Sequence, residues 1–420
     1  LVEAVEAATD GATITLLKDA ELTETLNINK AITLDGANHK ITGNASAGKT
    51  SFITVETDGD FTMKNATILP TSNVEANPAI DLQVKGKVVV DNCVFGAADD
   101  TNQFMYNGLE FSQSEDYPMA DGTTISNCTF YGGAFRHNFI SFYRIAEGAT
   151  ININGNKFLN ANWNDTNAIR VSNYSNVNAT INLLDDTYSD HGDDENKAYA
   201  GLLCFQELSS YNDNFTKLTV NIEKLDTTGA QSDQLFYVYK DSIISTNQPV
   251  VKGDSSIEKF FAAKVGDTYY KTLAEAIDAA SDGATITLLK DVTGMAVIPS
   301  GKTVTIDLSG HTITRTVTSG ENSKIYPALY VNGGTLTLDD TSEGKTGRVL
   351  SEITDTTVSG AMSNAVYVIS GAFTLKNGAL AATAAAAPAN NTWDTAYGVY
   401  VNKSTFTMEN GSVTVTAPDG

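Results

Sequence analysis

The sequence predicts an all-β solenoid, a stack of short strand-bearing coils arranged as two tandem units. Three observations predict this fold class. One opening segment occurs twice at an offset of 272 residues, strand-like segments recur every 27 to 35 residues, and an asparagine holds the same place in each of them. Repeats of roughly 20–50 residues are typical of solenoids, in which each coil packs on its neighbours.

The repeated opening covers residues 1–42 and 273–314, which are identical at 21 of 42 positions without a gap. Each copy begins with apolar residues at helical spacing. An Asp-Gly pair then ends the helix, because glycine accepts the left-handed backbone that closes it. The run Thr-Ile-Thr-Leu-Leu follows with strand character. We therefore expect each unit to open with a short capping α-helix and to continue as strands.

Five strand-like segments carry an asparagine three residues before an apolar side chain. These asparagines are Asn65, Asn92, Asn127, Asn377 and Asn410. A single coil cannot be stable alone, because ordering roughly thirty residues at about 1–2 kcal/mol each outweighs burying about five side chains at about 1.5–3 kcal/mol each. In a stack, asparagines at one turn can hydrogen-bond to the copies above and below. The sequence thus predicts a structural asparagine ladder.

The two openings divide the chain into a first unit, 1–254, a linker and hairpin, 255–272, and a second unit, 273–420. Pro249 and Gly253 stand among polar residues before the boundary, a composition typical of a linker. Two short apolar runs around Val265-Gly-Asp are typical of a hairpin. Both ends of the sequence fall within the repeat pattern, so we expect the stack to be open at each.

Composition excludes some classes of function. With 27 basic and 50 acidic side chains, the formal net charge is −23 at pH 7, which argues against nucleic-acid binding by phosphate neutralisation. No run approaches the roughly 18 apolar residues of a membrane span. Three cysteines cannot form a disulfide framework. Cys93 and Cys128 have matching contexts, so a bridge between them stays open, although two buried thiols are favoured.

The second opening, residues 270–291, is followed at 303–313 by a strand-like run that ends near a Gly-His pair. Together with the turn asparagines, this pattern resembles the right-handed parallel β-helix of the pectate-lyase-like superfamily. The opening motif is similar to tandem modules of large, adhesin-like surface proteins of gut bacteria. The resemblance implies a right-handed parallel β-helix in both units and an extracellular position on a bacterial cell surface. It implies no particular activity, because this superfamily contains lyases, hydrolases and inert adhesins.

Residues 136–194 concentrate chemically active side chains, with three of the five arginines and two of the four histidines of the chain. Residues 138–144 and 168–173 are strand-like. If they form neighbouring strands, alternation turns Tyr143 and Arg170 outward. An aromatic ring beside a guanidinium can stack on a sugar and hydrogen-bond to it. We expect a glycan-binding groove here, although outer ladders of this kind also occur for packing alone. Its candidate residues are Tyr143, Arg170, Trp163, Asp165, Arg144 and His137.

Neither a catalytic residue nor a cofactor is expected. The patterns Asn-Thr-Asp, Gly-His-Gly and Arg-Ile-Lys of hydrolases on this scaffold do not occur in the sequence. Paired aspartates stand in turn-like contexts, where they usually form solvated turns. An acidic loop with Asp190, Asp193 and Asp194 offers oxygen ligands for Ca²⁺, but its spacing does not match an EF-hand, and a solvated loop is favoured.

These observations favour a non-catalytic module of a bacterial cell surface, an adhesin or stalk that binds a glycan weakly through an outer groove. Weak sites are sufficient there, because multivalent display raises avidity. A host surface protein is a second kind of partner, whereas nucleic acid and a direct membrane span are not expected. The sequence does not determine the oligomeric state. The alternative function is a polysaccharide lyase or glycoside hydrolase, with residues 136–194 as its groove.

Overall fold

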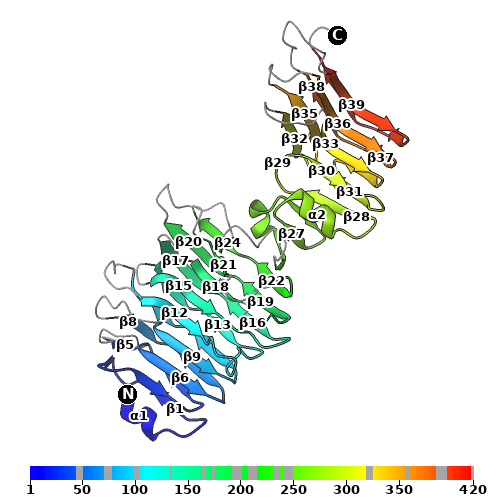
Figure 1. Ribbon diagram of the computed structural model, residues 1–420. Helices are drawn as coiled ribbons and strands as arrows, with labels where there is room; N and C mark the ends of the chain where they lie inside the picture. Colours follow the sequence, from blue (N-terminus) through cyan, green and yellow to red (C-terminus); the bar gives the residue numbers. More distant parts are fainter. Residues whose placement is uncertain are drawn as a thin grey trace. The chain divides into compact units, whose positions relative to one another are not determined.

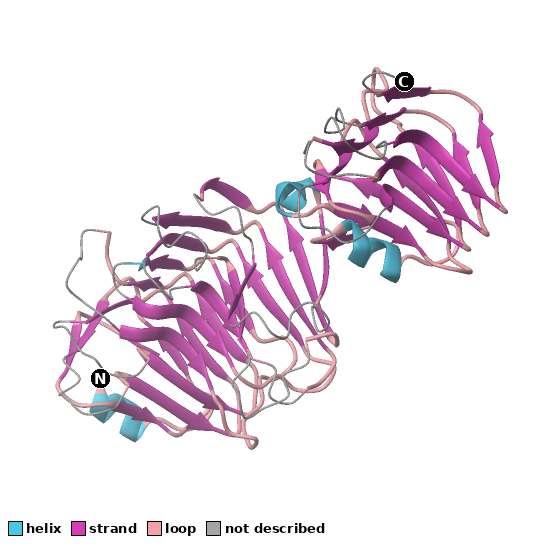
Figure 2. Cartoon of the chain, turned by 45° about the horizontal axis from the view of Figure 1, so that its top comes forward, coloured by secondary structure: helices cyan, strands magenta, loops and turns pink. Residues whose placement is uncertain are grey.

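The computed structural model describes residues 1–43, 51–70, 78–98, 105–132, 135–162, 167–172, 176–191, 201–206, 215–230, 236–239, 249–317, 325–354, 360–384 and 395–417. The chain forms two compact units, Leu1–Ile257 and Glu258–Gly420. Figures 1 and 2 show that both consist almost entirely of stacked strands. We call them unit 1 and unit 2 and describe each by itself.

Unit 1 consists of three parallel sheets, to each of which successive coils contribute one strand. The first sheet contains β1 (Thr13–Thr15), β4 (Thr33–Asp35), β7 (Phe61–Lys64), β10 (Val88–Asp91), β13 (Thr124–Ser126), β16 (Thr150–Asn154), β19 (Ala179–Leu184), β22 (Leu218–Glu223) and β25 (Val250–Gly253). The second contains β2 (Ala20–Leu22), β5 (Lys40–Gly43), β8 (Thr67–Pro70), β11 (Val94–Phe95), β14 (Thr129–Tyr131), β17 (Lys157–Asn162), β20 (Thr187–His191) and β23 (Asp226–Gly229). The third contains β3 (Leu26–Ile28), β6 (Ile53–Thr57), β9 (Ile80–Val84), β12 (Met105–Phe111), β15 (Phe135–Phe142), β18 (Asn167–Val171), β21 (Leu203–Gln206) and β24 (Phe236–Tyr239).

Unit 2 repeats this plan after an antiparallel hairpin of β26 (Ala263–Val265) and β27 (Thr268–Tyr270). A 3₁₀ helix, Ser255–Phe260, precedes the hairpin in the sequence. The first sheet continues from β26 with β28 (Ala284–Leu288), β31 (Thr303–Asp307), β34 (Thr335–Asp339), β37 (Ala372–Leu375) and β40 (Thr405–Met408). The second contains β29 (Val292–Thr293), β32 (Thr312–Val317), β35 (Arg348–Ile353), β38 (Ala379–Thr383) and β41 (Ser412–Thr416). The third contains β30 (Ala296–Ile298), β33 (Ile325–Asn332), β36 (Met362–Ile369) and β39 (Thr395–Asn402).

Alternation along the strands builds the core of each coil. In unit 1, Ile80, Leu109 and Ile140 are in register on adjacent strands, and each is completely buried. The rings of Phe95 and Phe130 stack on each other with centroids 4.7 Å apart. The inward rows are therefore continuous apolar columns, and the chain is an all-β, right-handed parallel β-helix.

A lysine closes the opening helix of each unit. The helices are α1 (Val2–Ala7) and α2 (Leu273–Ala279). The Nζ of Lys30 donates to two carbonyl oxygens of α1 at 3.2 and 2.6 Å, and the Nζ of Lys302 donates to two at the end of α2 at 3.1 and 2.7 Å. The last carbonyls of a helix have no partner within it, and a cation there also favours the helix dipole. The repeat thus preserves a helix-capping contact along with the helix.

The turn asparagines of unit 1 adopt left-handed backbone, with φ of 52° at Asn65, 50° at Asn92 and 55° at Asn127. Asparagine enters this region more readily than most residues, because its side chain bonds locally. The Nδ2 of Asn92 donates to the Oδ1 of Asn65 at 2.8 Å. Asn65 donates to Asp35 at 3.0 Å and Asn127 to Asp91 at 2.8 Å. Each side chain therefore bonds to the preceding coil, but two of the three acceptors are aspartates.

Unit 2 uses the same ladder with a different backbone. Asn410 donates to Asn377 at 3.1 Å, and Asn377 donates to the carboxylate of Asp339 at 2.6 Å. Here the residues that follow, Gly378 and Gly411, take the left-handed conformation, with φ of 100° and 99°. The ladder thus contains both asparagine–asparagine and asparagine–aspartate steps, because a carboxylate is the stronger acceptor where a coil provides one.

The two cysteines with matching contexts lie on adjacent coils. Cys93 and Cys128 are completely buried and unbridged, and the backbone N–H of Cys93 lies 3.5 Å from the sulfur of Cys128. Burial raises the pKa of the Cys128 thiol well above its usual value. Both side chains act as small apolar groups of the stack.

Candidate functional site

The third sheet of unit 1 carries polar side chains on the face opposite the core. Asp81, Glu110, Ser141 and Arg170 are in register on β9, β12, β15 and β18. Each stands between two buried apolar residues of its own strand, so alternation turns all four to the other face. Neighbouring strands are about 4.8 Å apart, and the four side chains therefore follow one another as rungs. We call these four residues the polar row.

Burial raises the pKa of both carboxyl groups of the polar row. For Asp81, desolvation is the main cause, and the negative charge of Glu56 acts in the same direction. For Glu110, desolvation again dominates and Asp81 adds to it, whereas a hydrogen bond from Asn107 and the charge of Arg170 lower the pKa. The Nδ2 of Asn107 lies 2.7 Å from the Oε2 of Glu110. Adjacent carboxyl groups with raised pKa values are common at functional sites.

Arg170 and Tyr143 bind each other at the end of the polar row. The Nη1 of Arg170 donates to the hydroxyl of Tyr143 at 3.2 Å, and the guanidinium carbon lies 4.9 Å from the ring centroid. The two side chains are 8% and 3% exposed. Arg170 lies on the face opposite the core, as alternation predicts, but this aromatic–guanidinium pair is nearly covered. The side chains are adjacent, but each covers the other.

Two buried polar atoms of the row have no hydrogen-bond partner among the residues that the structure describes: the Oγ of Ser141 and the Nε of Arg170. Ser141 is completely buried, and the two residues are in register. A buried polar group without a partner costs about 1–3 kcal/mol. A polar ligand or an ordered water at this point would satisfy both groups.

Arg144 contacts the segment that follows β12, and its predicted role in glycan binding stays a prediction. Its Nε donates to the backbone oxygen of Gln113 at 2.6 Å, and its Nη2 lies 3.3 Å from the Oε1 of Glu115. Its side chain is only 10% exposed. Its guanidinium thus binds the segment that follows β12.

The other candidates for the groove are not described. Trp163 and Asp165 lie outside the described residues. His137 belongs to β15, and its side chain lies outside the described part of the structure. Their predicted role in glycan binding stays a prediction.

The acidic loop considered for Ca²⁺ is described at one position only. Asp190 is 4% exposed and accepts a hydrogen bond from the hydroxyl of Tyr188 at 3.3 Å, whereas Asp193 and Asp194 lie outside the described residues. Within the described ranges, no three His, Cys, Asp or Glu side chains are grouped as metal ligands would be. None of the helices described is long and apolar enough to cross a membrane.

No motif in the sequence marks the two carboxyl groups of the polar row, Asp81 and Glu110. Each is a single acidic residue between apolar ones, as in Ile-Asp-Leu for Asp81 and Leu-Glu-Phe for Glu110. An acidic residue in the middle of a buried strand is a usable signal, because charged residues are rarely buried without a partner. The coils differ in length, so sequence alone does not show that Asp81 and Glu110 are adjacent.

The chain has structural similarity to solved proteins but no match among families or curated proteins. Among solved structures, the chain is similar to a mutant pectin methylesterase in complex with a hexasaccharide, at 14% sequence identity and a TM-score of 0.35. The match covers 67% of this chain and 91% of that chain. This likeness concerns the β-helical fold alone.

Proposed function

We propose that the chain is a non-catalytic module of a bacterial cell surface, an adhesin or stalk, and that the polar row of unit 1 binds a glycan weakly. One observation supports the binding site above all. The buried Ser141 Oγ and Arg170 Nε have no partner among the described residues, and they lie in the same row as two carboxyl groups.

The chemistry of the row suits a sugar. Hydroxyl groups both donate and accept hydrogen bonds, and the row offers carboxyl oxygens as acceptors, a guanidinium as donor and a hydroxyl that does both. Burial raises the pKa of both Asp81 and Glu110, which favours the protonated form that can also donate a hydrogen bond. A polyhydroxylated ligand can use all these groups at once.

The β-helix supports a stalk role through its regularity. Strand hydrogen bonds and the turn ladder join each coil to the next, so the sites on its faces keep fixed spacings. Many weak copies of such a site on a cell surface bind with high avidity.

Glycan binding by the row is tested with Glu110→Gln in the full chain. We expect weak, selective binding on a glycan array, and about tenfold weaker binding of the best ligand by the variant in titration calorimetry, because Gln cannot carry the carboxylate charge. Glu21→Gln is the matched control, since Glu21 is an exposed residue of β2 in another sheet. Equal binding by Glu110→Gln and wild type would contradict the assignment.

A polysaccharide lyase or glycoside hydrolase is the second candidate function. The adjacent carboxyl groups of Asp81 and Glu110 favour it, since retaining glycosidases use two carboxyls about 5 Å apart, one of them with a raised pKa. The test is incubation with neutral and uronic-acid polysaccharides. New reducing ends or unsaturated products that disappear in Glu110→Gln would establish cleavage and overturn the non-catalytic proposal.

A further inference from the structure

The third sheet of unit 2 carries tyrosines on its outer face. Tyr330, Tyr367 and Tyr400 are in register on β33, β36 and β39, and Val297 holds the preceding place on β30. The rings of Tyr367 and Tyr400 are stacked, with centroids 4.8 Å apart and planes at 10°. Tyr330 is 5.7 Å from Tyr367 and tilted by 57°. The tyrosine ladder therefore ends at Tyr330, where a valine stands in place of a fourth ring.

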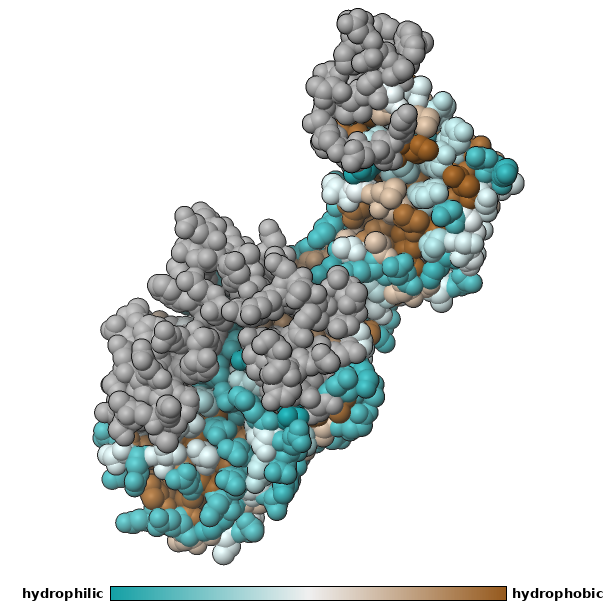
Figure 3. Space-filling model, in the orientation of Figure 1, coloured by the Kyte–Doolittle hydropathy of each residue, from teal (hydrophilic) through white to brown (hydrophobic). Residues whose placement is uncertain are grey.

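A hollow of about 340 Å³ lies beside this end of the ladder. Its lining includes Tyr330, Tyr326, Met295 and Arg315. Tyr326 is buried, and the guanidinium carbon of Arg315 lies 5.9 Å from its ring centroid. Met295 is 50% exposed. Figure 3 shows hydrophobic residues gathered on this part of unit 2, in the area of β30 and α2.

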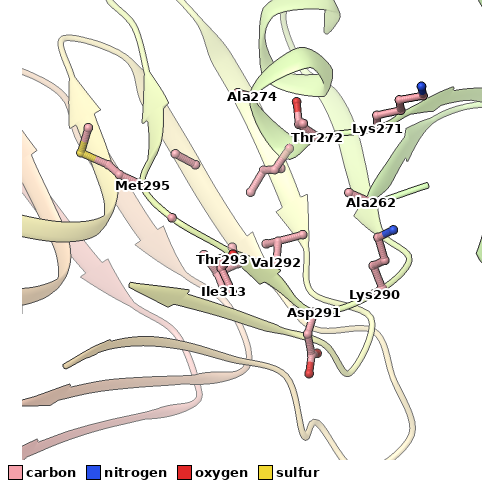
Figure 4. A pocket seen from close by; sticks show the side chains of 13 residues that line it. Ala262, Lys271, Thr272, Ala274, Lys290, Asp291, Val292, Thr293, Met295 and Ile313 are labelled. Atoms are coloured by element: carbon pink, nitrogen blue, oxygen red, sulfur yellow. The ribbon is translucent and has the colours of Figure 1, made fainter. Parts of the chain in front are cut away.

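A second hollow of about 290 Å³ shares Met295 with the first. Thr272 and two lysines, Lys271 and Lys290, contribute to its lining. Figure 4 shows both lysines on the side away from Met295, whereas the carboxylate of Asp291 points outward. The two hollows thus adjoin at Met295, with Arg315 in the first and the lysines at the far rim of the second.

We propose that these adjoining hollows of unit 2 bind a uronic-acid residue of a glycan, with the sugar ring against Tyr330 and its carboxylate at Arg315. This inference goes beyond the proposed function, because it concerns another unit and none of the residues of the polar row.

The size and chemistry of the hollows fit this ligand. Pockets for small molecules usually measure roughly 300–1,000 Å³ and are largely apolar, with a few polar groups that set the orientation. The apolar face of a pyranose packs on an aromatic ring, and the planar fork of arginine matches a carboxylate with two parallel hydrogen bonds. Because Arg315 is held over Tyr326, its guanidinium is partly fixed before a ligand arrives.

The distribution of charge also favours unit 2 for an anionic sugar. Residues 258–420 contain 16 acidic and 11 basic side chains, whereas residues 1–257 contain 34 and 16. The negative field that repels an anion is therefore weaker around unit 2, and cations line the hollows themselves.

The experiment uses the full chain and two matched probes. These are a β-1,4-linked trisaccharide of glucuronic acid and the corresponding trisaccharide of glucose, which differ only at the carboxyl carbon. In titration calorimetry, we expect the uronic-acid probe to bind at least tenfold more tightly. Tyr330→Ala should weaken binding of that probe at least tenfold. Tyr400→Ala, which removes a ladder ring that does not line the hollows, should leave the affinity unchanged.

Arg315→Gln tests the carboxylate contact separately. We expect this variant to bind both probes equally, at the affinity of the glucose probe. A thermal melt checks that each variant folds. If Tyr330→Ala does not fold, Arg315→Gln still tests the proposal. Equal affinity of wild type for the two probes, or unchanged affinity in folded Tyr330→Ala and Arg315→Gln, would overturn the proposal. Loss of uronic-acid binding in Glu110→Gln would instead assign the ligand to unit 1.

Discussion

Asp186 is a buried carboxyl group whose surroundings come from the neighbouring coil. It is 1% exposed, and its Oδ1 accepts hydrogen bonds from the backbone N–H and the Nδ2 of Asn156 at 2.7 and 3.0 Å. The Oδ2 has no partner among the described residues. Desolvation raises the pKa of Asp186 to about 7, against the two hydrogen bonds that lower it. The carboxyl group is therefore protonated in the folded state at mildly acidic pH.

This raised pKa makes stability depend on pH. The unfolded chain has a value near 3.9, so the folded state holds an extra proton between about pH 4 and pH 7. The contribution of Asp186 to the free energy of unfolding is therefore fully present below about pH 4 and is lost as the pH rises to about 7. Asp186→Asn should remove this loss, which amounts to at most about 4 kcal/mol, because the amide resembles the protonated acid. Urea unfolding of variant and wild type at pH 4.5 and pH 8 measures the difference.

Asp185→Asn is the control for this prediction. Asp185 is exposed and has a φ of 61°, a conformation that asparagine also accepts. Because the charge of Asp185 is only a minor cause of the raised pKa of Asp186, we expect this variant to keep most of the pH dependence of wild type. If the difference in free energy of unfolding between wild type and Asp186→Asn were the same at pH 4.5 and pH 8, Asp186 would not titrate in this window.

At the scale of the element, the turn between the first and second strands of a coil depends on one asparagine. Asn92 combines a left-handed backbone with a side-chain bond to Asn65. Asn92→Gly keeps the backbone conformation and loses the bond, whereas Asn92→Ala loses both. We expect Gly to lower the free energy of unfolding by about 1 kcal/mol and Ala by about 1–2 kcal/mol more. Chemical denaturation of the three proteins tests this order, and equal stabilities of the two variants would exclude a backbone role.

The sequence was sufficient to predict these turns but not all of their contacts. Asparagine at a constant place before an apolar residue indicates a repeated turn, as at Asn65 and Asn92. It does not show that Asn127 bonds to Asp91, since that depends on which side chain ends the strand one coil earlier. A second ladder, Asn152–Asn182–Asn221, runs along strand faces and has no turn signal in the sequence.

At the scale of the whole molecule, each coil packs mainly on its two neighbours. A cavity should therefore weaken the stack locally. Ile140 is completely buried on β15. We expect Ile140→Ala to cost about 2–5 kcal/mol. Hydrogen exchange should accelerate most in β12 and β18, which pair with β15, and least in β4. Uniform acceleration throughout unit 1 would instead indicate that the unit unfolds as one block.

The fold was predictable from the sequence to a greater extent than the site. Strand character, repeated openings and turn asparagines are local signals. They suffice because each coil of a solenoid contacts mainly the coils next to it in the sequence. The polar row requires knowing which residues of coils with unequal lengths are adjacent. The burial of Tyr143 and Arg170 depends further on what each contacts across coils, and alternation alone cannot supply it.

The contrast between the outer rows of the two third sheets has a consequence for how such proteins diversify. In unit 1 the row is Asp81, Glu110, Ser141 and Arg170, and in unit 2 it is a series of tyrosines. Neither series contributes to the apolar columns inside the coils. A duplicated module can thus change the chemistry of its outer rows one residue at a time, while the inward apolar residues that determine the fold stay the same.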